Sequence, residues 1–272
     1  MGGEVMKYLL QQNGYSFDKG LCIWSHPERE SIAYSDGDEV ELRLFDIINH
    51  ADDLSIISQE LKAQITDWPS FYHLTRLRAN LLRPVHDLLK GRILEIGAGC
   101  GAVTRFLGET GASVFALEGS VRRAKIAAAH CQDMDNVTVI ADSFDRFTAA
   151  NDFDVITLIG VLEYARVFFP SESGDPVDAM LRHAHKLLRP GGILLVAIEN
   201  QLGLKYFAGF KEDHLGVPMC GIEDLISYGW GRDFGTERIE TANKLCWIRA
   251  SILVVSLSRL QGTRLFSFRR RH

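Results

Sequence analysis

From Arg92 onward, short apolar runs alternate with segments of helical periodicity, and no other feature constrains the fold of this chain as strongly. Such alternation is typical of parallel βαβ units, in which a helix fills each connection between neighbouring strands. The sequence therefore predicts an α/β fold with a doubly wound, mostly parallel sheet. The expected strands are Arg92–Ile96, Ser113–Leu117, Val137–Ile140, Val155–Ile159 and Ile193–Ile198. The expected helices are Ala102–Glu109, Val121–Cys131 and Pro176–Leu188.

Three segments of the chain differ in pattern. Residues 66–228 form the predicted α/β core, and residues 1–65 a small N-terminal extension. Within the extension, Ser31–Glu41 alternates around Asp36-Gly37, a strong hairpin signal, and a polar helix is expected near Ser58–Thr66. Residues 229–272 form a C-terminal segment that closes the sheet, with a helix over 237–250 and paired strands at Ile252–Leu257 and Leu265–Phe268.

A further helix is expected just before the first core strand. Phe71–Leu89 has apolar residues at helical spacing, and Pro84 should kink or divide the helix. Such a helix can fold over a ligand at the sheet edge. Tyr72 and Arg78 are candidate binding residues, because the guanidinium could pair with a ligand carboxylate; otherwise this is an amphipathic packing helix with exposed basic residues.

Composition narrows the class of protein. Of 272 residues, 46% are hydrophobic and 24% charged, which is typical of a globular protein rather than a disordered or fibrous one. The formal net charge of −5 supplies no electrostatic footprint for nucleic acid. The five cysteines are scattered, without a C-x-x-C pair, so no metal site is predicted. We find neither a signal peptide nor an apolar run long enough for a membrane span, and expect a cytoplasmic protein.

The first core strand runs into the glycine-rich stretch Leu94-Glu95-Ile96-Gly97-Ala98-Gly99-Cys100-Gly101, after which a helix is expected. Glycines let the backbone turn sharply and approach a ligand, and the helix start offers free N–H groups. The spacing Gly97-x-Gly99-x-x-Ala102 also fits a dinucleotide fingerprint, so this stretch alone leaves an NAD-dependent oxidoreductase open.

Three later positions help to decide whether the glycine-rich stretch belongs to an NAD-dependent oxidoreductase or to another class of nucleoside-binding protein. Glu118 ends the second strand, where a carboxylate can accept hydrogen bonds from both hydroxyls of a ribose. Asp142-Ser143-Phe144 follows the third strand and could bind an adenine amino group and ring. Arg189-Pro190-Gly191-Gly192 is predicted to form a turn before the fifth strand.

With these motifs in order, residues 71–200 resemble the class I S-adenosyl-L-methionine-dependent methyltransferases, whose fold is Rossmann-like. The resemblance rests on the glycine stretch, Leu117-Glu118, Ala141-Asp142, Asp154 through Leu162-Glu163-Tyr164, and Leu188–Gly192. It implies that Glu118 binds the ribose of the cofactor, and that Asp142 with Ser143 faces the adenine. It also implies that the methionine part is surrounded by Glu95, Gly97, Ala98, Gly99 and Gly101.

Methyl transfer is an in-line displacement, which requires alignment of the acceptor and exclusion of water but no metal. If the acceptor is a hydroxyl or a protonated amine, a general base helps, and the candidates are Glu163, Glu199 and His214. Glu163 could instead position backbone, and His214 could be a surface histidine. The Asn/Asp-Pro-Pro-aromatic tetrad of amino-group methylation in nucleic acids is absent after the fourth strand.

Residues 68–225 also resemble a bacterial branch of these methyltransferases that is associated with cell-surface glycan assembly, through the motifs Glu199–Tyr206 and Glu212-Asp213-His214. This second resemblance implies a saccharide or other small-molecule acceptor. The chain departs from the longer pattern after about Gly229, which leaves open a non-catalytic, cofactor-binding module of a glycan-assembly system.

Overall fold

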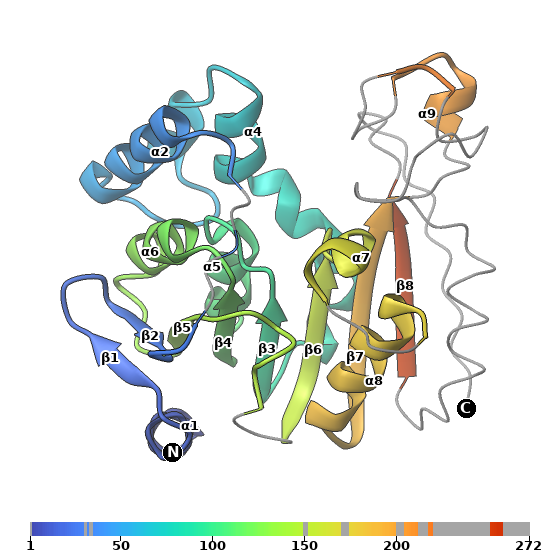
Figure 1. The fold of residues 1–272 in the computed structure, drawn as a ribbon. Coiled ribbons are helices and arrows are strands. Elements are labelled where there is room, and N and C mark those ends of the chain that lie inside the picture. The colour runs from blue at the N-terminus through green and yellow to red at the C-terminus, as the bar shows by residue number, and fades with distance from the viewer. Residues whose placement is uncertain are drawn as a thin grey trace. The chain divides into compact units, whose positions relative to one another are not determined.

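A computed structural model describes residues 2–29, 32, 35–148, 152–169, 174–199, 204–211, 217–219 and 251–257. The chain divides into two compact units, Met1–Val155 and Ile156–His272 (Figure 1). The predicted boundaries at residues 65 and 228 remain predictions.

The first unit contains a mostly parallel sheet with the strand order β1-β2-β5-β4-β3. β3, β4 and β5 pair in parallel, as the alternation predicted. β2 pairs in parallel with β5 and antiparallel with β1, so the N-terminal extension adds a hairpin to the sheet. The strands are β1 (Ser16–Asp18), β2 (Ile23–Ser25), β3 (Arg92–Ile96), β4 (Ser113–Glu118) and β5 (Val137–Ala141).

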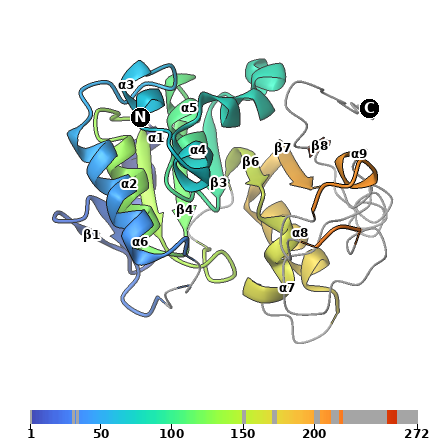
Figure 2. The same cartoon turned by 90° about the horizontal axis from the view of Figure 1, so that it is seen from above.

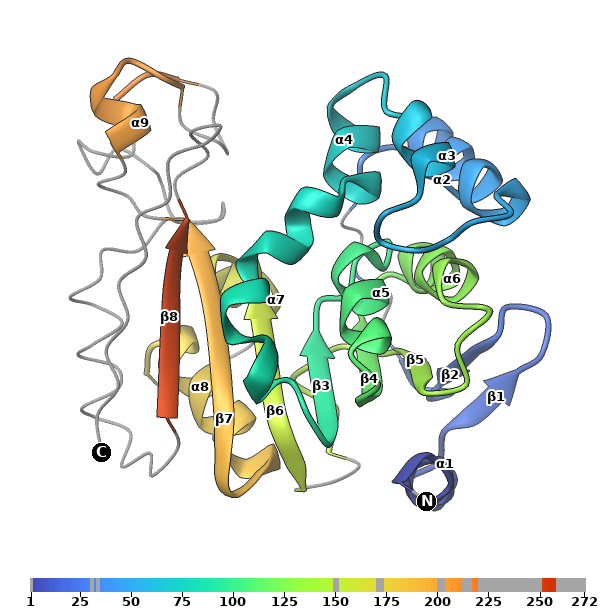
Figure 3. The same ribbon diagram turned by 180° about the vertical axis from the view of Figure 1, so that it is seen from behind.

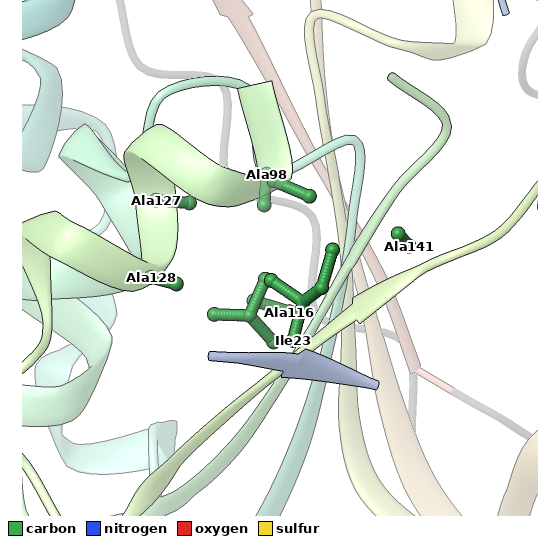
Figure 4. Close-up of a cluster of buried hydrophobic side chains, with 8 residues drawn as sticks. Ile23, Ala98, Ala116, Ala127, Ala128 and Ala141 are labelled. Atoms are coloured by element: carbon green, nitrogen blue, oxygen red, sulfur yellow. The ribbon is translucent and has the colours of Figure 1, made fainter. Parts of the chain in front are cut away.

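Two helices connect β3, β4 and β5. α5 (Ala102–Glu109) follows β3, and α6 (Val121–His130) follows β4. Small side chains let α6 approach the sheet closely, and Figure 4 shows them around Ile23 of β2. The cluster includes Ala98, Ala116, Ala127, Ala128 and Ala141. The Rossmann-like fold class is confirmed, and this dense packing fixes the turn between β3 and α5.

The extension is mainly helical. Figures 1 and 2 show α2 (Asp38–His50) beside α6. Its buried Leu44 and Ile48 share an apolar cluster with Leu74 and Ile126. The other helices before β3 are α1 (Gly2–Gln12), α3 (Gln59–Ala63), α4 (Trp68–Leu74) and the 3₁₀ helices η1 (Arg76–Leu81) and η2 (Arg83–Leu88).

The hairpin predicted at Ser31–Glu41 is wrong. Asp38 and Glu41 lie in the first turn of α2, where acidic side chains favour the positive end of the helix dipole. Gly37 adopts φ +106° as the N-cap, so the Asp-Gly pair starts a helix instead of turning a hairpin. The helix expected near Ser58–Thr66 is confirmed as α3, with Ser58 as its N-cap.

The helix predicted over Phe71–Leu89 is divided twice. The α-helix ends before Thr75, whose hydroxyl accepts a hydrogen bond from the Leu77 N–H and caps η1. Pro84 then lies in the first turn of η2, where its missing N–H costs least. The division at Pro84 is thus confirmed, whereas the earlier end of the α-helix before Thr75 and the 3₁₀ geometry after it were not predicted.

The second unit has the strand order β6-β7-β8, and β7 pairs in parallel with β8. The α8 helix begins as predicted, because Asp175 accepts a hydrogen bond from the Val177 N–H and Pro176 occupies the first turn. Figure 3 shows β7 and β8 in front of α8. The elements are β6 (Phe153–Ile159), η3 (Leu162–Tyr164), α7 (Ala165–Phe168), α8 (Pro176–Leu187), β7 (Leu188–Glu199), α9 (Leu204–Phe207) and β8 (Ser251–Leu257).

One expectation in this unit needs correction. The predicted turn at Arg189–Gly192 lies inside β7, where Gly191 has a φ of +79°. The strand predicted at Ile252–Leu257 is confirmed as β8. The helix predicted over 237–250 and the strand predicted at Leu265–Phe268 lie outside the described residues.

Candidate functional site

The turn between β3 and α5 depends on glycine. Gly97, Gly99 and Gly101 have φ values of +73°, +57° and +88°. A Cβ on Gly101 would lie 2.9 Å from Ala127 Cα, whereas a Cβ on Gly99 would meet no atom within 4 Å. Gly101 therefore serves the contact between helices, and the backbone at Gly99 borders open space in which a ligand can approach it.

Glu118 lies at the carboxyl end of β4, beside this turn. Its Oε2 accepts a hydrogen bond from the Gly99 N–H at 2.7 Å, and its Oε1 accepts one from the Ser120 N–H at 2.8 Å. Because each carboxylate oxygen can accept two hydrogen bonds, one acceptor position is left on each oxygen. The side chain can thus receive two more donors from one ligand.

Asp142 lies one residue beyond β5, at the next strand end. Its backbone N–H donates to the Glu118 carbonyl oxygen at 3.1 Å, which ties the two strand ends together. Its side-chain Oδ1 accepts from the Ser143 N–H at 2.8 Å, and its Oδ2 from the Tyr15 hydroxyl at 2.5 Å. No local sequence pattern indicates this role of Tyr15, because its partner lies 127 residues away.

Glu95 lies on β3 at the other side of the turn. It is buried, and it accepts a hydrogen bond from the Thr104 hydroxyl of α5 at 2.6 Å. Arg78 of η1 stacks on the Tyr72 ring of α4, with 4.1 Å between the guanidinium carbon and the ring centroid. Because this stacking holds the Arg78 charge in place, α4 and η1 present an ordered cation in this unit.

Burial raises the proton affinity of both carboxylates that flank the turn. It raises the pKa of Glu95 to about 8, and the positive charge of Arg78 partly opposes this rise. Burial also raises the pKa of Glu118, against the hydrogen bonds from Ser120 and Gly99. Ligand groups that donate hydrogen bonds or carry positive charge offset this cost of burial, and we expect such groups here.

An ion network with a buried Arg123–Glu41 pair lies near Glu118 and was not predicted from the sequence. Arg123 of α6 contacts Glu41 Oε1 of α2 at 2.9 Å and Asp36 Oδ2 at 2.7 Å. His73 of α4 contacts the same Asp36 oxygen at 2.8 Å. Most charged residues on helices are exposed to solvent, so the sequence of a predicted helix does not indicate which of them are buried. The network anchors the extension next to the strand that carries Glu118.

The extension also contacts the residue after Glu118. The Ile32 N–H donates to the Gly119 carbonyl oxygen at 3.3 Å, and the Ile32 side chain packs where a Cβ at position 119 would lie. A side chain larger than hydrogen at position 119 would therefore displace Ile32.

The three candidate bases belong to the second unit. Glu163 is buried in η3, and Glu199 is the last residue of β7. His214 lies outside the described residues. Their catalytic roles remain predictions.

In the part of the chain that the structure describes, no group of three or more His, Cys, Asp or Glu residues could hold a metal ion. None of the described helices has the length and apolar character to cross a membrane.

Comparison with known families finds a domain match. Residues 94–194, which include the glycine turn, Glu118 and Asp142, match a family model described as a methyltransferase domain. The matched range extends from β3 into β7. It therefore contains the three strand ends at which the site was predicted.

Two relatives illustrate the similarity in sequence. A demethylmenaquinone methyltransferase of Tropheryma whipplei (strain Twist) is 31% identical over 135 residues, covering 50% of this chain and 52% of the relative. A ubiquinone biosynthesis O-methyltransferase of Parvibaculum lavamentivorans is 29% identical over 127 residues, covering 46% of each. The chain thus spans about half the length of these relatives.

Among solved structures, similarity extends to a protein described as a putative sarcosine dimethylglycine methyltransferase from Galdieria sulphuraria. The identity is 17% and the TM-score 0.45, with 77% of this chain and 74% of the other covered.

Proposed function

We propose that residues 94–194, which match a methyltransferase domain, use S-adenosyl-L-methionine to transfer a methyl group to a small-molecule acceptor, with a saccharide as the acceptor class. The observation that supports this most directly is the pair of remaining acceptor positions on Glu118, beside the open space at Gly99. Two adjacent ribose hydroxyls match that pair.

The described residues fit the cofactor at three strand ends. Glu118 would hold the ribose, Asp142 would accept a hydrogen bond from the adenine amino group, and Glu95 would attract the positive charge of the methionine part. Arg78 would pair with the methionine carboxylate. When bound, the cofactor supplies an electrophilic methyl group on a sulfonium.

The chain's own residues contribute alignment. The backbone N–H groups of Gly97 and Ala98 both donate to the Leu117 carbonyl oxygen, at 2.8 Å and 3.1 Å, which fixes the turn before any ligand arrives. A preformed turn reduces the entropic cost of orienting the reactants. Glu163, Glu199 and His214 are our candidates for the group that removes a proton from the acceptor.

The acceptor class rests on the sequence resemblance to enzymes of glycan assembly. The names of the two relatives point instead to quinones and their biosynthesis, and one of the two names specifies an O-methyltransferase. A saccharide and the acceptor of an O-methyltransferase both present a hydroxyl as nucleophile. The acceptor panel must therefore contain sugar nucleotides and free saccharides in one set, and dihydroxylated aromatic rings in the other.

The first test is calorimetric titration of the full chain with S-adenosylmethionine and S-adenosylhomocysteine, with NADH as control. We expect micromolar binding of the adenosyl ligands and none of NADH. The second test incubates the chain with S-adenosylmethionine and each acceptor, and follows the mass gain of one methyl group. Folded protein that binds neither adenosyl ligand would refute the proposal, and binding without turnover would favour the non-catalytic module.

A further inference from the structure

Tyr15, in the N-terminal extension, reaches the strand end that we assign to adenine. It lies between α1 and β1, and its hydroxyl donates to Asp142 Oδ2 at 2.5 Å. Tyr15 is 6% exposed and Asp142 is 2% exposed. The hydrogen bond is therefore shielded from water, which would otherwise compete for both groups.

The Tyr15 side chain is held on several sides. Its backbone N–H donates to the Leu10 carbonyl oxygen at 3.0 Å. Its ring makes edge contacts with His26 and Phe147, at centroid distances of 5.4 Å and 6.3 Å. The hydroxyl is thus delivered by a packed ring and does not depend on Asp142 for its position.

The direction of the hydrogen bond follows from the charges. Burial, together with the hydrogen bond to Asp142, raises the pKa of Tyr15 above its ordinary value, so the hydroxyl remains a protonated donor. With Tyr15 on Oδ2 and the Ser143 N–H on Oδ1, each oxygen of Asp142 keeps one acceptor position. The two donors together fix where those positions point.

We propose that Tyr15 is a positioning residue for the cofactor: it fixes the Asp142 carboxylate so that a free acceptor position faces the exocyclic amino group of adenine. The inference rests on the proposed function and adds the N-terminal extension to the cofactor site. Without the hydroxyl, Asp142 Oδ2 loses a buried donor, and the carboxylate must turn towards another one. Recognition of the amino group then weakens.

The experiment measures selectivity and not affinity alone. S-adenosylhomocysteine and S-inosylhomocysteine differ at this position of the purine, where an amino donor is replaced by a carbonyl oxygen. Dissociation constants of both ligands are measured by calorimetry for the wild type, Tyr15→Phe and Tyr8→Phe. Tyr8 is a matched control, because it is a tyrosine of the same extension with 59% exposure.

We expect the wild type and Tyr8→Phe to prefer the adenosyl ligand equally. Tyr15→Phe should reduce that preference by roughly 10- to 150-fold, the effect of one hydrogen bond to a charged group. In Asp142→Asn, which has no carboxylate to position, adding Tyr15→Phe should have little further effect. Incorporation of 4-fluorophenylalanine at position 15 fills the volume of the hydroxyl without a donor, and should match Tyr15→Phe even if the latter folds poorly.

If Tyr15→Phe binds both ligands equally more weakly than the wild type, Tyr15 only supports the fold and the proposal is overturned. Unchanged selectivity in the variant with 4-fluorophenylalanine would overturn the proposal as well. If the wild type binds S-adenosylhomocysteine and Tyr15→Phe keeps full selectivity, this inference is refuted and the proposed function is not. A folded wild type that binds neither ligand refutes the proposed function and this inference with it.

Discussion

The backbone N–H of Gly99 donates to Glu118 Oε2 at 2.7 Å, and this bond joins the glycine turn after β3 to the end of β4. The same carboxylate accepts the Ser120 N–H on its other oxygen. Glu118 therefore shapes the turn in the free protein and still offers acceptors to a ligand. Loss of its carboxylate should affect the turn and the ligand together.

Substitution of Glu118 tests this double role. Glu118→Ala should weaken S-adenosylhomocysteine binding by about 2–3 kcal/mol, or roughly 30- to 150-fold, through loss of two ribose hydrogen bonds. Glu118→Gln should also weaken it, because the amide NH₂ must face one of the two backbone N–H donors. Calorimetry gives both constants, and exposed Glu39→Ala is the control. An unchanged constant in Glu118→Ala would contradict the assignment.

Alanine substitutions at Gly101 and Gly99 should distinguish a glycine that is needed for packing from one that is needed for ligand binding. Gly101→Ala places a Cβ against the α6 backbone at φ +88° and should destabilise the protein by roughly 2–4 kcal/mol. Gly99→Ala meets no protein atom, so we expect a loss of only about 1 kcal/mol from its left-handed backbone, but clear loss of cofactor binding. Urea denaturation and calorimetry measure the two effects. Equal binding by Gly99→Ala and wild type would show that no ligand approaches this backbone.

Glu95 should make stability depend on pH. Its pKa is about 8 in the folded protein and ordinary in the unfolded chain, so the folded state retains a proton that the unfolded state releases. The contribution of Glu95 to the free energy of unfolding therefore falls as pH rises from about 4.5 to 8, by up to roughly 4 kcal/mol. Wild type and Glu95→Gln are compared by denaturation at pH 5, 6.5 and 8. A constant difference across this range would disprove the shift.

The same carboxyl should release a proton when the cofactor binds, because positive charge on the methionine part favours its ionised form. Titration at pH 7 in two buffers of different ionisation enthalpy measures the release. Wild type should release a proton and Glu95→Gln should not. Equal release by the two proteins would assign the proton to another group.

The ion network of Arg123 should contribute more to the free energy of unfolding than an exposed ion pair does. Arg123→Met removes the guanidinium that Glu41 and Asp36 share, while Arg122 still contacts Glu41 and His73 still contacts Asp36, so we expect a loss of roughly 1–3 kcal/mol. Arg43→Met is the matched control, since its pair with Asp67 is substantially exposed and should contribute much less to the free energy of unfolding. Urea denaturation compares the two variants. Similar small losses would mean that the network is not a strong link between the extension and α6.

Elements with local signals were predictable from the sequence. β3 and α5 have the predicted bounds, because an apolar run, a glycine turn and a helical period follow one another within 18 residues, from Arg92 to Glu109. Glu118 and Asp142 could be placed at strand ends for the same reason. Since parallel strands end at one edge of a sheet, locating the strands also located the polar groups that follow them.

The extension was not predictable in the same way. The Asp-Gly pair at 36–37 suits a hairpin or a helix start equally well in local terms, and packing of Leu44 and Ile48 against α6 favours the helix. Tyr15 and Arg123 acquire their roles from partners 127 and 82 residues away. No window of sequence contains both members of such a pair, and β2 is likewise placed by its partner β5.

The pairing of β2 with β5 has a consequence for synthesis on the ribosome. Trp24 pairs with Ile140, so the strand made first must wait for the strand that completes its edge of the sheet. At about 5–20 residues per second, the chain between them takes on the order of 10 s to emerge. During that interval the apolar side chains of β2 have no sheet to join. The nascent extension is therefore the segment of this protein that we expect a chaperone to contact first.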